Sequence, residues 1–384
     1  MSNETAMLVP TPPAIRKIER ISPTLYEAAM KCTSRAAWLV GGDQKLLPPH
    51  PRALLGIGLH AVLERARSGG IAGATEDERL ADAERRFDDK MRELFAAAHP
   101  LLHAKFDGPD RLPFYNLFRA RSAQMAADAS AASSARAGQA GAGTRAVGCG
   151  PAIEAALASK DGRVAGRADL LDAANATVID YKTGAAGDTG PLTDSELRQL
   201  RLYAYLASEN GISITRGVIE RADRTRAEVP ISTEQAVEEG RRALAVLDGY
   251  NEHVGKPFES GASPSPDACR FCPCIPFCDA FWKSAEPAWS EDCGTHMEGV
   301  VESVEGGQLV SINLNVTRGT GARGAAVVTR LSRDWLVFSG AAFPQPQQTV
   351  RVTNTAHVED SAAPALFRAD RITTAVWTVP SKAP

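Results

Sequence analysis

The chain has 384 residues, a formal net charge of −3 and 44% hydrophobic residues. This length allows one large domain and a smaller one with ample core. A charge so close to neutral gives no global attraction to nucleic acid, so any such binding must come from local basic patches. The polar N-terminus has no apolar run, and no stretch reaches the roughly 20 apolar residues of a membrane span. We therefore expect a cytoplasmic protein without membrane contact, whose seven cysteines are reduced thiols or metal ligands.

Helical patterns dominate the first part of the chain. After an N-terminal tail at residues 1–20, Ser22-Pro23 is typical of a helix start. Further helices are predicted around residues 58–65 and over residues 76–98, where apolar side chains recur at helical spacing. Alanine, serine and glycine then predominate, and we expect a flexible segment without core at about residues 128–148.

From Ala152 the pattern changes to short strands separated by turns, with helices after them. The order of helix, three strands, helix, strand and helix is typical of an α/β domain with a mixed central sheet flanked by helices. The predicted strands cover residues 152–159, 163–172, 177–181 and 214–220, and the predicted helices cover residues 194–209 and 233–250.

The last part of the chain is predicted to be all-β. Short strands between residues 298 and 379, with glycine-rich turns at 306–307 and 319–324, favour a small β-barrel. We expect an α/β domain over residues 21–288 and this barrel over residues 289–384. An OB-fold is the first candidate, because such barrels often bind single-stranded nucleic acid. An SH3-like barrel or an irregular sandwich would give a similar pattern.

Acidic residues and a lysine come together on the predicted strands. Asp180 and Lys182 are two residues apart on one strand, so both side chains point to the same face. A turn around Asn175 folds the strand that carries Asp169 back beside them. Two carboxylates and an ammonium that converge are typical of a site for a hard divalent cation and a phosphate ester.

The next helix carries Gln199 and Tyr203, four residues apart on one face. Together with Gly166-Arg167-Ala168-Asp169 and Ile179-Asp180-Tyr181-Lys182-Thr183-Gly184, they resemble the motifs of the PD-(D/E)XK nuclease superfamily. The resemblance is to its RecB/AddB-like and CRISPR-associated RecB-like branch with an iron–sulfur cluster, and it covers about residues 20–285. It implies a PD-(D/E)XK nuclease core, in which Gln199 and Tyr203 position the DNA backbone or the metal shell.

The same resemblance suggests a metal site and its chemistry. It implies that His60, Asp169, Asp180 and the Tyr181 carbonyl bind Mg²⁺ or Mn²⁺. Lys182 would orient the nucleophilic water or stabilise the charge of the transition state. The alternative for His60 is a core histidine on an apolar helix, and the two aspartates favour the metal role.

Glu154, on the strand before Gly166, is a further acidic candidate for the catalytic site. A solvent-facing strand residue is an equal alternative.

Four cysteines lie close together in one segment, at Cys269, Cys272, Cys274 and Cys278, which indicates a metal site. In one interpretation all four bind zinc tetrahedrally. In the other, Cys32 joins three of them to hold a 4Fe-4S cluster. The resemblance favours the cluster, since iron–sulfur members place one cysteine before the histidine helix and three after the last helix. That pattern uses Cys269, Cys272 and Cys278 and leaves Cys274 without a counterpart. Two other cysteines are expected to be ordinary thiols, Cys149 and Cys293.

The leading prediction is a metal-dependent deoxyribonuclease that acts on single-stranded or end-containing DNA. The expected mode of cleavage is that of an exonuclease. Repair, recombination and phage defence are all compatible with this activity. The chain has no phosphate-binding loop of the P-loop type, so it would act alone or beside a separate helicase. The alternatives are a non-catalytic DNA-binding or assembly subunit that kept the fold, and a nuclease that acts on RNA.

The barrel would guide the strand to the active site through aromatic stacking and backbone contacts. A stability or partner-docking domain is an equal alternative. The candidate nucleic-acid-binding residues are Trp335, Phe338, Arg330 and Arg333.

Overall fold

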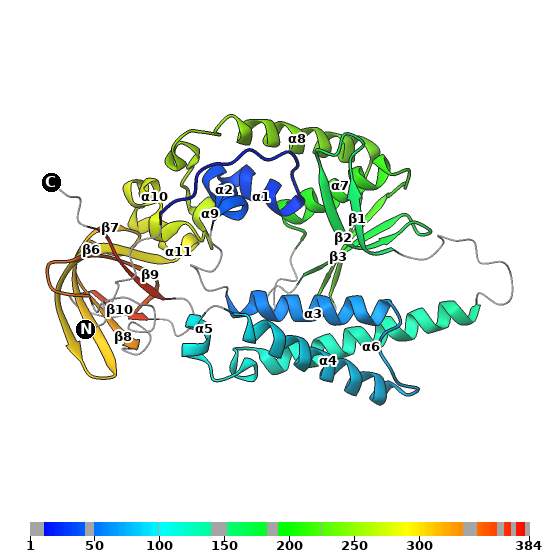
Figure 1. The fold of residues 1–384 in the computed structure, drawn as a ribbon, viewed down its shortest axis with the longest axis horizontal. Coiled ribbons are helices and arrows are strands. Elements are labelled where there is room, and N and C mark those ends of the chain that lie inside the picture. The colour runs from blue at the N-terminus through cyan, green and yellow to red at the C-terminus, as the bar shows by residue number, and fades with distance from the viewer. Residues whose placement is uncertain are drawn as a thin grey trace.

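The computed structural model describes residues 11–42, 50–98, 100–139, 152–182, 191–223, 225–332, 344–358, 365–369 and 374–380. These residues form a helical bundle, a sheet that carries further helices on its other face, and a β-barrel (Figure 1). Within these ranges, no helix has both the length and the apolar character needed to cross a membrane.

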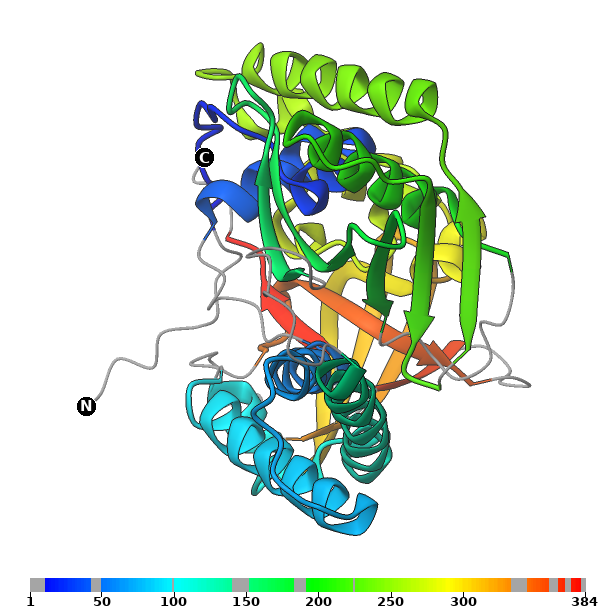
Figure 2. The same cartoon turned by 90° about the vertical axis from the view of Figure 1, so that its right-hand side faces the viewer.

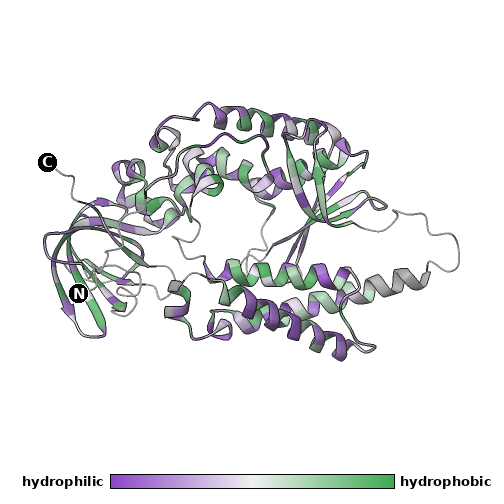
Figure 3. Cartoon of the chain, viewed as in Figure 1, coloured by the Kyte–Doolittle hydropathy of each residue, from purple (hydrophilic) through white to green (hydrophobic). Residues whose placement is uncertain are grey.

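The bundle lies on one face of the sheet. Thr75 and Glu78 form a capping box at the start of α4, in which each side chain accepts a hydrogen bond from the other's backbone amide. Most of α4 is hydrophilic (Figure 3), whereas Phe87 and Met91 are fully buried in the bundle core. The helices are α3 (Pro51–Arg67), α4 (Glu76–Ala96), α5 (Pro100–Lys105) and α6 (Tyr115–Gln139).

Helix α6 extends into the segment that was predicted to be flexible. Residues 128–139, expected to begin the flexible segment, are helical, because alanine has the highest helix propensity of all residues. The rest of that segment, with Cys149, lies outside the described residues.

The sheet has the order β1-β2-β3-β4-β5, and only β3 and β4 are parallel within it. It is therefore a mixed sheet, and the predicted α/β class is confirmed. The edge strand β5 was not predicted. The strands are β1 (Ala152–Ala158), β2 (Ala165–Asp172), β3 (Thr177–Lys182), β4 (Arg216–Arg221) and β5 (Arg226–Pro230).

Helices cover the second face of this sheet, so that the sheet lies between two helical layers (Figure 2). Ser22 starts α1 as predicted: its hydroxyl accepts a hydrogen bond from the Leu25 amide, and Pro23 occupies the first helical position. The helices of this layer are α1 (Pro23–Lys31), α7 (Asp194–Glu209) and α8 (Thr233–Asn251).

A third core joins the N-terminal helices to the cysteine-rich segment. The rings of Trp38 and Phe277 pack against each other there at a tilt of 40°, with 4.8 Å between ring centroids. Its helices are α2 (Thr33–Gly41), α9 (Pro266–Cys269), α10 (Asp279–Ser284) and α11 (Ser290–Cys293). Short 3₁₀ turns lie at Pro109–Arg111, Phe258–Gly261, Ile275–Phe277 and Pro287–Trp289.

The C-terminal strands close into a barrel. Strand β10 pairs in parallel with β8 and antiparallel with β9, and this closes the order β10-β8-β7-β6-β9. Strand β11 extends the edge of β9. The small barrel was predicted, but β10 was not, and the strand expected at residues 336–338 lies outside the described residues. The strands are β6 (Thr295–Gly306), β7 (Leu309–Gly319), β8 (Gly324–Ser332), β9 (Thr349–His357), β10 (Ala365–Ala369) and β11 (Ala375–Thr378).

Arg351 of β9 attaches the barrel to the cysteine-rich segment. Its guanidinium lies 2.7 Å from Glu298 of β6 and 2.7 Å from Asp279 of α10, and it donates to the Pro276 carbonyl at 2.9 Å. Arg351 and Glu298 are both buried. Removal of one partner of a buried ion pair is strongly destabilising. Arg351 therefore holds the barrel and the cysteine-rich segment in one arrangement.

Candidate active site

The acidic residues meet where the strands of the sheet diverge. The register that pairs Ile153 with Leu170 and Ala155 with Ala168 places Glu154 opposite Asp169. Between β2 and β3 the ladder ends at the pair Leu170–Ile179, and the two aspartates are the next residues on each strand. In place of a ladder bond, the Tyr181 amide donates to the Asp169 carboxylate at 2.7 Å.

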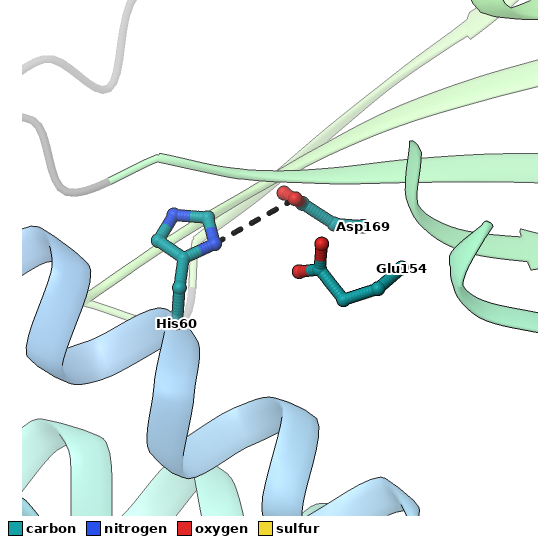
Figure 4. A group of neighbouring side chains, drawn as sticks. All are labelled: His60, Glu154 and Asp169. Carbon is teal, nitrogen blue, oxygen red and sulfur yellow. Dashed lines mark ion pairs between the residues drawn. The ribbon is translucent and has the colours of Figure 1, made fainter. Parts of the chain in front are cut away.

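His60 of α3 reaches this site from the bundle side (Figure 4). Its Nδ1 lies 3.6 Å from Asp169 Oδ1. One ligand atom from each of His60, Glu154 and Asp169 falls within 4.8 Å of the others. Glu154 has a left-handed backbone, with φ of 48°, a conformation that costs a non-glycine residue free energy and that clusters at functional sites. The three side chains form a group that fits a hard cation.

Asp180 and Lys182 lie beside this group and are fixed by α7. Lys182 Nζ is 2.8 Å from Asp180 Oδ2 and donates to Gln199 Oε1 at 2.6 Å. Gln199 Nε2 in turn donates to Asp180 Oδ1 at 2.8 Å. Tyr203 donates from its hydroxyl to the Arg167 carbonyl at 2.8 Å. Gln199 and Tyr203 therefore hold the two strands in place, and Tyr203 is buried rather than available to a DNA backbone.

Without a cation, the surroundings of the site disfavour the ionised form of its carboxyl groups. Burial, followed by the charge of Asp180, raises the pKa of Asp169 to about 7. Burial and the charge of Asp169 raise the pKa of Glu154 as well. Burial lowers the pKa of His60, which keeps the imidazole in the neutral form that binds metals. A divalent cation would remove this repulsion, because its charge stabilises both carboxylates in ionised form.

Arg67 is a residue of this site that the sequence prediction missed. It lies two helical turns beyond His60 on α3, and its guanidinium is 4.6 Å from the centroid of the Tyr181 ring. Its charge lowers the pKa of Asp169. The spacing of seven residues from His60, which puts both side chains on one helix face, is the signal that could have identified it.

The cysteines form a second candidate site. A cavity is lined by Cys32 from the end of α1 together with Cys269, Cys272, Cys274 and Cys278. Chain segments more than two hundred residues apart thus meet at one point. Burial raises the pKa values of Cys269 and Cys278 to about 12, so these side chains are thiols unless a metal displaces their protons. Cys293 lies on α11, where its thiol donates to the Trp289 carbonyl.

The structure places only one of the barrel's candidate nucleic-acid-binding residues. Arg330 is an exposed residue of β8 and has φ of 62°, at a bulge against β7. Trp335, Phe338 and Arg333 lie outside the described residues.

Comparison with known proteins identifies one family. The family model described as "PD-(D/E)XK nuclease superfamily" matches residues 20–279. No curated protein matches the chain. Among solved structures, "Crystal structure of SSO0001" is 17% identical, with 45% of this chain and 81% of that chain covered and a TM-score of 0.24. This similarity is too low to support any conclusion about the present chain.

Proposed function

The chain belongs to the PD-(D/E)XK nuclease superfamily, and from this membership we propose that it is an active deoxyribonuclease of the RecB/AddB-like branch. It hydrolyses phosphodiester bonds in single-stranded or end-containing DNA, as an exonuclease, with Mg²⁺ or Mn²⁺. The observation that carries the proposal is the group of His60, Glu154 and Asp169 within 4.8 Å, with Asp180 and Lys182 beside it. A non-catalytic subunit that kept the fold would have no need to hold these carboxylates close together, where they repel each other.

The site residues fit the cation that such nucleases use. Carboxylate oxygens are ligands that Mg²⁺ and Mn²⁺ prefer, and a neutral imidazole completes the set. His60, Glu154, Asp169 and Asp180 would hold the ion, with the Tyr181 carbonyl as a further ligand. When bound, the ion would neutralise charge on the phosphodiester and lower the pKa of a water molecule.

The chain's own residues prepare the site for attack on the phosphate. Lys182 carries the ammonium that stabilises negative charge as it develops on the phosphate oxygens. Gln199 bridges Lys182 and Asp180, so the Lys182 ammonium and the Asp180 carboxylate keep a fixed separation. Arg67 contributes a second positive charge from the bundle side. Because these groups are already positioned, little reorganisation is needed in the transition state.

The first test is the degradation of end-labelled single-stranded DNA with Mg²⁺ or Mn²⁺. Wild-type protein should cleave only with the metal, and Lys182→Ala should lose cleavage. Lys160→Ala is the matched control, since Lys160 is exposed in the turn between β1 and β2, and it should behave as wild type. Absence of cleavage by intact protein, on single- and double-stranded DNA, would favour the non-catalytic DNA-binding subunit. Faster cleavage of RNA than of DNA would favour the RNA-directed alternative.

We further infer that Cys32, Cys269, Cys272 and Cys278 hold a 4Fe-4S cluster. Cys32 lines the same cavity as the cysteines of the cysteine-rich segment, which supports the interpretation that uses Cys32 over a zinc site made of the four local cysteines alone. The cluster would join α1 to the end of the nuclease core and close a loop of more than two hundred residues. Cys32→Ala protein should be colourless and aggregated, and unchanged iron content and solubility would contradict the assignment.

We also propose that the barrel is OB-like and guides a DNA strand to the active site. The closure of β6 to β10 with one parallel pair supports a five-stranded Greek-key barrel of this kind. Exposed Arg330, aimed by its bulge, would contact the backbone. A helicase that works beside this nuclease would supply the single strand in repair, recombination or phage defence.

A further inference from the structure

The turn between Cys269 and Cys272 carries an aromatic side chain out into solvent. Phe271 is 82% exposed, more than any other large hydrophobic residue in the described part of the chain. A single exposed hydrophobic residue is ordinary in itself. Phe271 differs in that its backbone conformation is also unfavourable for a residue with a large side chain.

The turn has the geometry of a type II β-turn. The Cys272 amide donates to the Cys269 carbonyl at 2.9 Å. Arg270 has φ of −57° and ψ of 121°, and Phe271 has φ of 54°. The third position of a type II turn requires positive φ and is normally occupied by glycine. Phenylalanine here gains nothing from burial and adopts an unfavourable backbone conformation, so neither packing nor local conformation accounts for it.

The turn is also held firmly and carries positive charge. Arg35 of α2 donates from one guanidinium nitrogen to the carbonyls of Ala268, at 3.1 Å, and Arg270, at 3.3 Å. The Arg270 side chain is exposed, and its guanidinium lies 5.3 Å from the centroid of the Phe271 ring. An exposed aromatic face beside an exposed guanidinium is the combination that binds single-stranded nucleic acid, by stacking on a base and by attraction to a phosphate.

We propose that Phe271 and Arg270 form a binding site for one unpaired base of a DNA strand, separate from the residues that hold the cation. The inference rests on the proposed deoxyribonuclease function and extends it to the way the substrate is held. The ring would stack on the base while the Arg270 guanidinium contacts the neighbouring phosphate. Because a base offers its face only when it is unpaired, this contact would favour single strands over blunt duplexes. Arg35 would keep the turn rigid, so little conformational entropy is lost on binding.

The test is equilibrium binding of a fluorescently labelled oligothymidylate to the full, iron-loaded chain in EDTA, where no cleavage occurs. Phe271→Ala should weaken binding roughly 5- to 150-fold, the range expected for one stacked base. Phe271→Trp should retain affinity, whereas Phe271→Leu, which keeps an apolar side chain without a π face, should not. Phe271→Gly should bind as weakly as Phe271→Ala while keeping its iron, because glycine suits the turn. Val254→Ala is the control, since Val254 is 40% exposed and lies outside this turn.

Two results would overturn the proposal. Unchanged affinity in Phe271→Ala would show that the ring does not contact the strand. Retained affinity in Phe271→Leu would show that an apolar side chain suffices here and that the ring does not stack on a base. Neither result concerns catalysis. If wild type cleaves DNA with metal and Phe271→Ala binds as wild type does, this inference is wrong and the nuclease assignment stands. No cleavage with weakened binding removes the nuclease and leaves the base-binding site.

Discussion

Asp169→Asn should stabilise the metal-free protein above neutral pH while it removes the protein's response to divalent cations. The pKa of Asp169 is about 7 in the folded protein, compared with an ordinary value of 3.8. A carboxyl group with a raised pKa stabilises the fold below its unfolded pKa and loses that contribution as the pH rises through its folded pKa. A pKa difference of about three corresponds to a loss on the order of 4 kcal/mol in the free energy of unfolding. The charge of Asp180 contributes to this loss, because it raises the pKa of Asp169.

The assay is chemical denaturation in EDTA at about pH 5 and about pH 8, which lie on either side of the folded pKa. The variant should gain stability over wild type mainly at the higher pH. The amide oxygen can still accept the hydrogen bond from the Tyr181 amide, so the backbone contact is kept. Addition of Mn²⁺ should then stabilise wild type, because an ion that binds only the folded state shifts the equilibrium toward it, and it should leave the variant unchanged.

Asp89→Asn is the matched control, because its side chain is 57% exposed on α4. It should change stability little at either pH and should keep the response to Mn²⁺. Equal stability of wild type and Asp169→Asn at the higher pH would refute the argument that the carboxylates repel each other without a cation. Stabilisation of Asp169→Asn by Mn²⁺ would refute the assignment of Asp169 as a ligand.

Three other substitutions test the surroundings of the two sites. Gln199→Ala should slow single-turnover cleavage about 10- to 100-fold, because Lys182 loses the group that fixes it; an unchanged rate would mean that the bridge is dispensable. Cys274→Ala should keep its iron and its colour if the cluster uses the other four cysteines, whereas loss of iron would make Cys274 a ligand. Arg351→Met should destabilise the chain by about 3 kcal/mol, since Glu298 is left buried without this partner. Limited proteolysis should then release the barrel, and a wild-type digestion pattern would contradict this role.

The sequence alone determined the parts of this protein that depend on local patterns. Short strand segments separated by turns predicted β1 to β4 within a few residues, and local signals such as the Ser22 cap predicted the start of α1, whereas β5 was missed. The spacing of Asp180 and Lys182 on one strand face, and of Gln199 and Tyr203 on one helix face, predicted which side chains would lie together. These inferences succeed because the periods of strands and helices are properties of the backbone itself.

Other parts depended on the tertiary structure, because they join residues far apart in the chain. The divergence of β2 and β3 beside Asp169 follows from packing, and so does the raised pKa of that residue. Arg67 enters the site only because α3 crosses the sheet there. Strand β10, short and paired on both sides, has a weak local pattern and is stabilised by closure of the barrel. The exposure of Phe271 was equally hidden, since a phenylalanine between two cysteines gives no sign that its ring will point into solvent.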